Sequence, residues 1–283
     1  MAPFVTAAVV VGVFAVMLLL ERRVPLRKTR ESKGHRTARN LAMGGVAFAV
    51  ATSLQTALLV PFADWTISQR IGLLHLVELP IVFEVIVAVL LMDYLLWVWH
   101  WANHRVPLLW RFHLVHHIDR DMDSSTALRF HFGEHAISTF YRALQIAVVG
   151  ASPGAVWVWQ ILLFISILFH HGNVQLPIAW ERRLVRIIVT PRMHAIHHSD
   201  YQNETDSNWS SLFSWWDYLH GTILLSVPQR TIRIGVPAYE SAEDVTLGRI
   251  LMIPFRPQRR DWYLGDDDRS RRVHDGPVAA LAE

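Results

Sequence analysis

Apolar residues in this chain gather in long runs that short polar stretches separate. The first run covers residues 4–20, the second covers 41–62, and a third reaches from about Leu79 to Trp99. About 20 consecutive apolar residues are enough for a helix to cross the hydrocarbon core of a bilayer. The mixed segment 63–78 is expected at the membrane interface. The pattern therefore predicts an all-α fold, an integral membrane helical bundle.

Two shorter apolar stretches, 136–150 and 155–170, lie on either side of the turn signal GASPG. Each is short for a complete span, so the pattern predicts a membrane hairpin whose depth it leaves open. The chain becomes polar from about Gly235, and we expect the tail to fray after about Asp266. We expect three sections: N-terminal transmembrane helices with a basic loop at 1–78, a catalytic domain with the hairpin at 79–255, and a polar tail at 256–283.

Composition supports a membrane protein. Hydrophobic residues make up 52% of the chain and charged residues 18%, whereas soluble domains carry roughly 25% charged residues. The chain has no cysteine, which excludes thiolate zinc sites, cysteine-ligated iron–sulfur clusters and cysteine nucleophiles. The formal charge of +3 is small for a nucleic-acid-binding protein, so nucleic acid is not an expected partner.

The basic segment 21–40 predicts the orientation in the membrane. Segments rich in Lys and Arg stay in the cytoplasm, so the first apolar run starts outside and the third returns to the cytoplasm. The hairpin then leaves from the cytoplasmic face and comes back to it. A cleaved signal peptide is the alternative for 4–20, but no basic region precedes this run and no small-residue cleavage site follows it. We expect a multi-pass protein with a helical histidine-rich cap on the cytoplasmic face.

Three histidine clusters, HWANH, HLVHH and HAIHH, follow these apolar stretches. Spacings of three and four residues place the imidazoles of one cluster on one helix face. Neutral imidazole is a common ligand of iron, zinc and copper. Eight imidazoles exceed the roughly four to six ligands of one ion, so the pattern predicts two metal ions. The candidate ligands are His100, His104, His113, His116, His117, His194, His197 and His198.

Four further histidines have weaker patterns. His171 follows the second half of the hairpin and is the candidate for a ninth ligand. His131 is a weaker candidate, while His135 and His170 are expected to pack or to orient the ligands. Whether His131, His135 or His170 binds metal stays open at this point.

Carboxylates near such a site would orient the imidazoles and balance the metal charge. Asp93 lies seven residues before His100, on nearly the same helical face. Glu84 lies inside an apolar run, where pairing with a neighbouring helix is the alternative explanation. For Asp119 and Asp200 the alternative is helix capping or a solvated charge. The candidate orienting residues are Asp93, Asp119, His131, Glu134, His135, Asn173, Asp200 and Asp217.

The residue pattern leaves the chemistry open between three classes. Zinc would suit a membrane hydrolase, and iron would suit oxygen activation. A metal transporter or sensor would need ionisable residues along a path through the membrane, whereas these histidines gather at one face. No phosphate loop, dinucleotide fingerprint, H-E-x-x-H or G-x-S-x-G motif is present.

At these residues the chain resembles the fatty acid hydroxylase superfamily, also called the sterol desaturase family. The resemblance covers about residues 80–255 and includes HWANH, HLVHH, TALRFH, FHHGNVQLP, TPRMHAIHHSD and ETDSNWSSLFSWWDYLHGT. It departs from the family pattern at Phe132, where proline is frequent, and at Tyr218–Thr222, where Arg-Leu-Phe-Gly-Thr is frequent. Neither departure involves a candidate ligand.

The resemblance implies an O₂-dependent membrane oxidoreductase with a histidine-coordinated di-iron (Fe²⁺) centre. The eight histidines would be its ligands, and His171 matches the histidine of the family's F-x-H-x-N stretch. The substrate would be a membrane lipid or sterol-like molecule that is hydroxylated or desaturated. Because the chain has no flavin fingerprint and no cysteine cluster, electrons would come from a separate ferredoxin or cytochrome-type donor with its reductase. The substrate, the carbon oxidised and the oligomeric state stay open.

Overall fold

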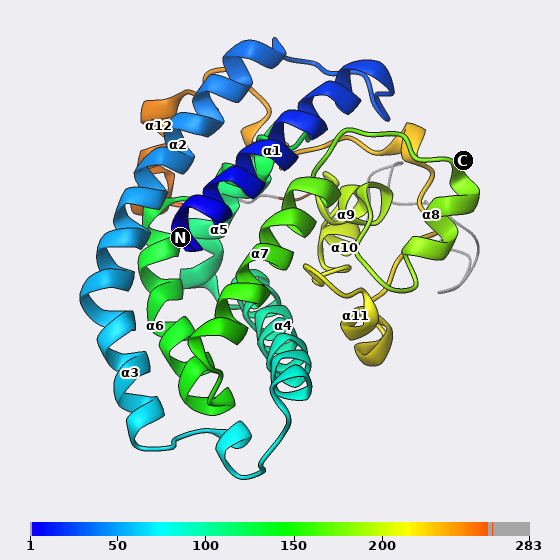
Figure 1. Cartoon of the computed structure of the whole chain (residues 1–283). Coiled ribbons are helices and arrows are strands. Elements are labelled where there is room, and N and C mark those ends of the chain that lie inside the picture. Colours follow the sequence, from blue (N-terminus) through cyan, green and yellow to red (C-terminus); the bar gives the residue numbers. More distant parts are fainter. Residues whose placement is uncertain (1, 260–261, 263–283) are drawn as a thin grey trace.

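A computed structural model describes residues 2–259 and residue 262, and this part of the chain is all-helical, without a β-strand (Figure 1). Isolated β-bridges, such as that between Pro25 and Val174, link segments outside the helices. The predicted fraying after Asp266 falls outside the described residues. The long helices are α1 (Ala2–Arg23), α2 (Lys33–Leu54), α4 (Ile81–Arg105), α6 (Phe132–Val149) and α7 (Pro153–His170).

Four helical segments are long and apolar enough to cross a membrane. Their outer surfaces carry large exposed apolar side chains, with Phe48 71% and Val11 66% exposed. Such a surface is unstable in water and suits contact with lipid. The chain is therefore a membrane protein, as its apolar runs predict. The four segments are Val5–Arg23, Lys33–His75, Ile81–Arg105 and Pro153–His170.

The second spanning segment is longer than its apolar run. Helix α2 continues through a π-helical turn, Gln55–Leu59, into α3 (Val60–Ser68). The helix therefore extends beyond the predicted range 41–62 at both ends, and half of the segment expected at the interface is helical. Its polar start is helical because Arg36 and Asn40 are buried against partners distant in sequence. Gly72, with φ of 117°, lies in the turn that follows α3.

The predicted hairpin consists of α6 and α7. Gly150 ends α6 in the left-handed conformation, and the Ser152 side chain accepts a hydrogen bond from the Ala155 backbone N–H at the start of α7. The hairpin tip touches the turn after α3: a Cβ added to Gly72 would lie 2.3 Å from the Gly150 Cα. The hairpin thus reaches the same end of the bundle as the α3–α4 connection (Figure 1).

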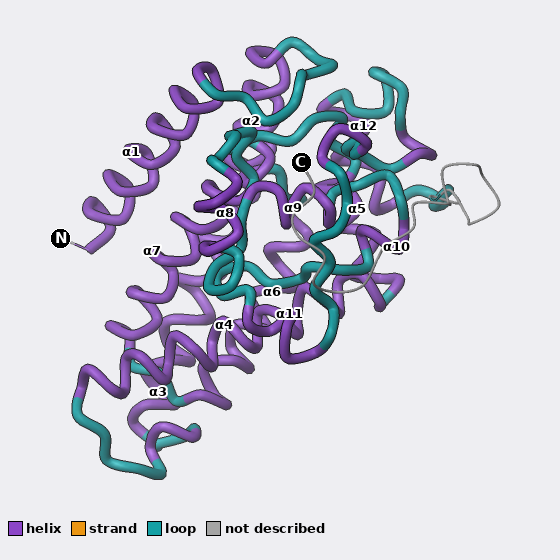
Figure 2. Tube along the Cα trace, turned by 90° about the vertical axis from the view of Figure 1, so that its right-hand side faces the viewer, coloured by secondary structure: helices purple, strands orange, loops and turns teal. Residues whose placement is uncertain are grey.

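Short helices form a cap at the opposite end of the bundle from α3 (Figure 2). One hydrophobic cluster of the cap contains Val189, Met193 and Ile223. Another joins Met43 of α2 to Leu114 of α5, so the N-terminal helices share a core with the histidine-bearing region. The helices of this end are α5 (Pro107–His117), α8 (Ile178–Leu184), α9 (Pro191–His197), α10 (Gln202–Thr205), α11 (Trp215–His220) and α12 (Leu247–Met252).

A buried polar network ties α2 to the loop after α5. Arg36 Nη1 donates to Asp119 Oδ2 at 2.8 Å, and Asn40 Nδ2 donates to the same oxygen at 3.0 Å. Arg129 Nη1 donates to Asn40 Oδ1 at 3.0 Å. Burial alone would raise the pKa of Asp119, but Arg36, Arg129 and Arg39 outweigh this effect and hold it at about 2. The network fixes the segment between HLVHH and the hairpin.

Candidate metal centre

Four helix ends converge at the boundary between bundle and cap, and each brings histidines. The last turns of α4 carry His100 and His104, and the end of α7 is followed by His171. The nine predicted ligands form two groups, and the ligand-capable atoms within each group lie within 4.8 Å of one another. One group is His100, His104, His113, His117 and His197; the other is His116, His171, His194 and His198. The structure brings all nine together, while their binding of metal stays a prediction.

Local sequence explains how the clusters reach this point. Val106 is extended and Pro107 starts α5, so the chain turns between HWANH and HLVHH. In the third cluster, Thr190 is the N-cap residue and Pro191 the first residue of α9. The Thr190 side chain makes no capping hydrogen bond, so the start of α9 depends on the proline and on tertiary packing.

Backbone carbonyls fix the orientation of several rings. Nδ1 lies 2.8 Å from a carbonyl oxygen in His100 (Trp209), His171 (Ile167) and His197 (Ser207). His116 Nδ1 lies 3.3 Å from the Arg129 oxygen. A carbonyl only accepts hydrogen bonds, so these rings carry their proton on Nδ1. Their Nε2 lone pairs are therefore available to a metal ion. Sequence reasoning missed these carbonyls, because no residue type encodes them.

The distances between Nε2 atoms test whether the site fits a metal ion. Nε2 of His171 lies 3.1 Å from Nε2 of His116 and 3.0 Å from Nε2 of His194. With both protons on Nδ1, the Nε2 atoms of His116 and His171 face each other as two lone pairs. This contact is repulsive unless a cation lies between them. Among the described residues, Nε2 of His197 and of His104 is buried without a hydrogen-bond partner. The donor set therefore fits bound metal.

Burial keeps these imidazoles in the neutral form that binds metal. It lowers the pKa of His197 to about 3, although the Ser207 carbonyl opposes the shift. It lowers the pKa of His171 to about 4, against the effect of the Ile167 carbonyl. Burial and neighbouring histidines hold the pKa of His194 and His198 well below the usual range. All four rings are therefore uncharged at neutral pH.

Glu134 is the predicted orienting carboxylate that contacts a candidate ligand. Its Oε1 lies 2.9 Å from His113 Nδ1, and the residue is buried in the first turn of α6. A carboxylate here fixes the His113 tautomer and adds a negative charge beside the group of five histidines.

Asp217 and Asp93 do not contact the candidate ligands directly but hold the segments around them. Asp217 accepts hydrogen bonds from the Trp209 and Ser210 backbone N–H groups at 3.0 and 2.9 Å. It thereby holds the segment whose Trp209 carbonyl faces His100. Asp93 accepts from Trp216 Nε1 at 2.7 Å and from the Phe213 N–H at 3.1 Å. Both carboxylates position the loop that covers α4.

The weaker histidine candidates lie outside both groups. His131 is the N-cap of α6, where its Nδ1 accepts from the Gly133 N–H at 3.0 Å. The His135 ring packs against Phe130, with ring centroids 5.6 Å apart. The His170 ring is buried 4.1 Å from that of His194, measured between centroids.

The remaining polar candidates support other parts of the fold. Asn173 pairs through its side chain with both backbone groups of Arg27 at 2.8 Å and so fixes the linker after α1. Asp119 belongs to the Arg36 network, and Asp200 lies 3.7 Å from Arg233 Nε. Glu84 is half-buried in the first turn of α4, where a negative charge is favourable for the helix dipole.

Sequence reasoning also missed Glu21, which is buried near the end of α1. Its carboxylate accepts from the Ser124 N–H at 2.7 Å, from the Asn173 N–H at 3.2 Å and from Lys33 Nζ at 2.6 Å. The position of an acidic residue directly after an apolar run was the sequence feature that could have indicated this role.

A cavity of about 220 Å³ lies between α4, α6 and α7 and reaches the histidines. His100, His113, His171 and four other histidines line it. Leu96, Leu163 and Ile167 form part of its apolar wall. The arrangement places a largely apolar space beside the candidate metal centre.

The part of this cavity away from the histidines is polar. The Arg142 guanidinium lies 4.0 Å from the ring centroid of Trp159. Arg142 Nη1, Gln145 Oε1 and Trp159 Nε1 are buried and have no hydrogen-bond partner within the described residues. Buried polar atoms without partners are costly, so this position suits a polar group of a bound molecule.

Residues 85–222 match the family model described as fatty acid hydroxylase, and this region of the chain belongs to that family. The chain is 28% identical over 218 residues to an ornithine lipid hydroxylase of Rhizobium tropici, covering 74% of this chain and 63% of that protein. It is 26% identical over 149 residues to cholesterol 25-hydroxylase of Mus musculus, covering 50% of this chain and 46% of that protein. The predicted family resemblance is confirmed.

A third relative is the alkylglycerol monooxygenase of Xenopus tropicalis, 26% identical over 130 residues that cover 44% of this chain and 27% of that protein. The chain thus matches less than two thirds of the length of each of these relatives. No solved structure matches it. The relatives are named as hydroxylases or a monooxygenase, and the histidine clusters fit a metal-dependent oxygenase.

Proposed function

We propose that this chain is a membrane-bound di-iron oxygenase that hydroxylates or desaturates a lipid or sterol-like substrate. It would use O₂ as co-substrate and electrons from outside the chain. The observation that carries the proposal is the convergence of nine histidines in two groups, with Nε2 atoms as close as 3.0 Å. The Nε2 lone pairs of His116 and His171, 3.1 Å apart, repel each other unless a cation lies between them.

The donor set favours iron over zinc. Structural and catalytic zinc sites are usually four-coordinate, with at most about four protein ligands. One of the two groups here contains five imidazoles, which suits the higher coordination number of iron. The family and the printed names of the relatives also favour oxygenation over hydrolysis. A transporter is disfavoured because the histidines gather at one end of the bundle.

Two iron ions held by the two histidine groups would supply O₂ activation and the removal of hydrogen from an unactivated C–H bond. The protein residues supply geometry. Carbonyls of Ile167 and Ser207 hold the imidazoles with Nε2 facing inward, and Glu134 balances positive charge. The apolar walls of the cavity exclude water and align a hydrocarbon segment beside the histidines.

The cavity supports an amphiphilic substrate. Arg142 and His135 lie seven residues apart on α6, a separation of about 10 Å along the helix axis. A substrate whose polar group pairs with Arg142 would therefore extend its apolar part past His135 toward the candidate ligands that line the same cavity. The relatives' names include an ornithine lipid, cholesterol and an alkylglycerol, each of which joins a polar group to an apolar body.

The electron donor would be a separate ferredoxin or cytochrome-type protein with its reductase. The chain contains no cysteine and no dinucleotide fingerprint to bind a flavin or nicotinamide itself. The basic segment 21–40 favours the cytoplasm for the histidine site, where such donors would reach it.

The test compares lipids from cells that produce the wild-type chain, His197→Ala or His35→Ala. His35 is exposed and lies outside both groups, so its variant is the matched control. We expect an O₂-dependent oxidised lipid with wild type and with His35→Ala, but not with His197→Ala. Purified wild type should contain about two iron ions per chain. Two zinc ions together with a hydrolysed lipid would refute the proposal.

A further inference from the structure

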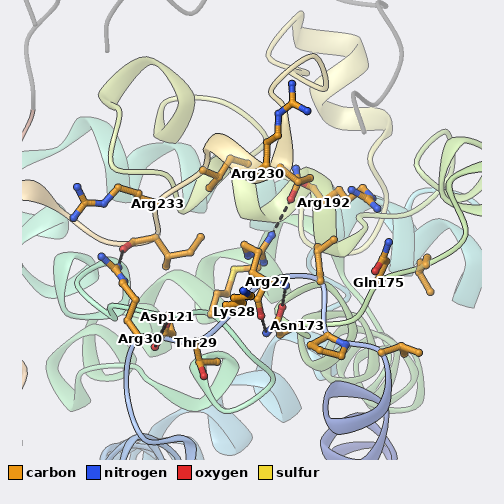
Figure 3. A pocket seen from close by; sticks show the side chains of 18 of the residues that line it. Arg27, Lys28, Thr29, Arg30, Asp121, Asn173, Gln175, Arg192, Arg230 and Arg233 are labelled. Carbon is orange, nitrogen blue, oxygen red and sulfur yellow. Dashed lines mark hydrogen bonds between the residues drawn. The ribbon is translucent and has the colours of Figure 1, made fainter. Parts of the chain in front are cut away.

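A second, larger cavity of about 1180 Å³ lies beside the end of α1, outside the histidine site (Figure 3). Eight of its lining side chains are Arg or Lys, and Asp121 is its acidic one. The cations come from the linker after α1, from the loop after α5, from the start of α9 and from residues 230–233. Arg120, Arg192 and Arg233 pair with Glu31, Glu181 and Glu240, and the remaining cations leave the cavity electropositive.

The acidic residue does not neutralise the cavity. Asp121 Oδ2 accepts hydrogen bonds from the Arg30 and Glu31 backbone N–H groups at 2.9 and 2.8 Å. The Arg30 side chain in turn donates through Nε to the Arg120 carbonyl at 2.8 Å. These contacts shape the rim of the cavity, and the Asp121 carboxylate is engaged by the backbone.

Arg27 offers an unused donor inside the cavity. Its Nη1 donates to Gln229 Oε1 at 2.8 Å, while Nη2 is buried and has no partner in the described part of the chain. Figure 3 shows Arg27 between Arg192 and Asn173. Burial and the charge of Arg192 lower the pKa of Arg27 to about 10, so it stays charged at neutral pH. An anion here would offset the repulsion between Arg27 and Arg192 and would accept a hydrogen bond from Arg27 Nη2.

Two further cations are exposed at the cavity. Lys28 and Arg230 form no ion pair with any described residue. They can approach an anion without losing a partner. Arg192, by contrast, is held by Glu181, whose Oε2 accepts from Arg192 Nε at 2.8 Å.

The position of the cavity indicates where its ligand comes from. Helix α1 is a candidate span that ends at Arg23, and Arg23 itself lines the cavity. Apolar residues Val24, Leu26 and Ile178 also line it. A lipid that lies along α1 would therefore bring its headgroup to the cavity opening. Basic pockets beside spanning helices suit anionic headgroups.

We propose that this cavity binds a phosphate-bearing anion, supplied by the headgroup of an acidic phospholipid. The Arg27 guanidinium and the Lys28 and Arg230 side chains would contact the phosphate oxygens. An acidic protein partner would contact a broad surface. The Arg27 Nη2 group, which has no hydrogen-bond partner among the described residues, instead lies within a cavity that suits a small anionic group. This site is distinct from the histidine site, and it does not depend on the proposed activity.

Binding to purified full-length protein in a neutral detergent tests the proposal. The probes are short-chain phosphatidylglycerol, short-chain phosphatidylcholine and inorganic phosphate. The binding of each probe is measured by titration, through the shift that it causes in the unfolding temperature of the protein. The test variant is Lys28→Gln/Arg230→Gln. The control, Arg182→Gln/Arg183→Gln, removes two exposed cations of α8 that do not line the cavity. A further variant, Arg27→Gln, probes the buried donor.

We expect phosphatidylglycerol to stabilise wild type and the control equally, and phosphatidylcholine to have little effect. The affinity of Lys28→Gln/Arg230→Gln should fall roughly tenfold or more, since each surface cation contributes about 1 kcal/mol to the binding of anionic lipid. Equal affinity for inorganic phosphate would assign the site to soluble phosphate and overturn the headgroup source. Equal weakening in the control, or binding of an acidic protein without any lipid binding, would overturn the proposal.

Discussion

At the scale of single residues, the candidate metal centre depends on which nitrogen of each imidazole carries the proton. Carbonyl oxygens of Trp209, Ile167 and Ser207 select the Nδ1 proton, and Glu134 takes the same position beside His113. The identity of the histidines was predictable from their spacing. Their orientation was not, because the atoms that orient them belong mostly to the backbone.

Glu134→Gln tests the carboxylate beside His113. The amide oxygen of glutamine can still accept a hydrogen bond from the His113 Nδ1–H group, but the negative charge is lost. We expect metal affinity to fall about 10- to 100-fold, as is typical when an outer partner of a ligand is changed. Metal competition with a chelator measures this change, and Glu84→Gln in the first turn of α4 is the control. Unchanged metal affinity in Glu134→Gln would show that its charge does not act on the site.

Arg142→Met tests the polar part of the histidine-lined cavity. Loss of a charged hydrogen-bond donor costs about 1.5–3 kcal/mol, so the KM for an amphiphilic substrate should rise roughly 10- to 100-fold. Metal content should not change, because Arg142 lies outside both histidine groups. Steady-state kinetics in detergent separate KM from kcat. A fall in kcat alone would exclude a role in holding the substrate.

At the scale of elements, long apolar runs predicted the spanning helices but not their docking. The runs at 4–20, 79–99 and 155–170 correspond to α1, α4 and α7. The depth of the α6–α7 hairpin stayed open because length alone does not determine it. The contact between Gly150 and Gly72 places its tip at the α3–α4 connection. This contact joins residues from separate runs, so no local pattern contains it.

Gly72→Ala tests the docking of the hairpin. Gly72 has φ of 117°, and an added Cβ would lie 2.3 Å from the Gly150 Cα. We expect a loss of about 1–3 kcal/mol of stability from backbone strain, with the steric clash adding to it. Thermal unfolding measures the loss. Gly154→Ala is the matched control, since its Cβ would meet open space; an equally small effect in both variants would contradict the docking.

At the scale of the whole molecule, the histidine-rich site joins the membrane bundle and the cap. Its residues come from α4, α5, α7 and α9, and the Arg36 network holds α2 against the loop that follows α5. Burying many imidazoles together makes stability depend on pH, because protonation would place several positive charges in one small volume.

The metal-free protein should lose stability on mild acidification. His171 and His197 have folded-state pKa values of about 4 and about 3, below the unfolded value of about 6.5. Between these values the unfolded chain binds more protons, so stability rises with pH. Their contribution is complete above about pH 6.5 and is lost as the pH falls toward 4. Unfolding temperatures at pH 7.5 and 5 measure it; a higher value at pH 5 would contradict this expectation.

The sequence by itself determined the membrane class, the positions of the long helices and the nine candidate ligands. The membrane class, the long helices and eight of the ligands follow from patterns within one helix, where spacing decides which face a residue occupies. His171 followed from its place after the hairpin and from the family resemblance. Tertiary structure alone decided the division into five and four histidines, the carbonyls behind them and the basic cavity beside α1. These features join residues distant in sequence, as Arg36 joins Asp119, and local spacing carries no information about which distant segments pack together.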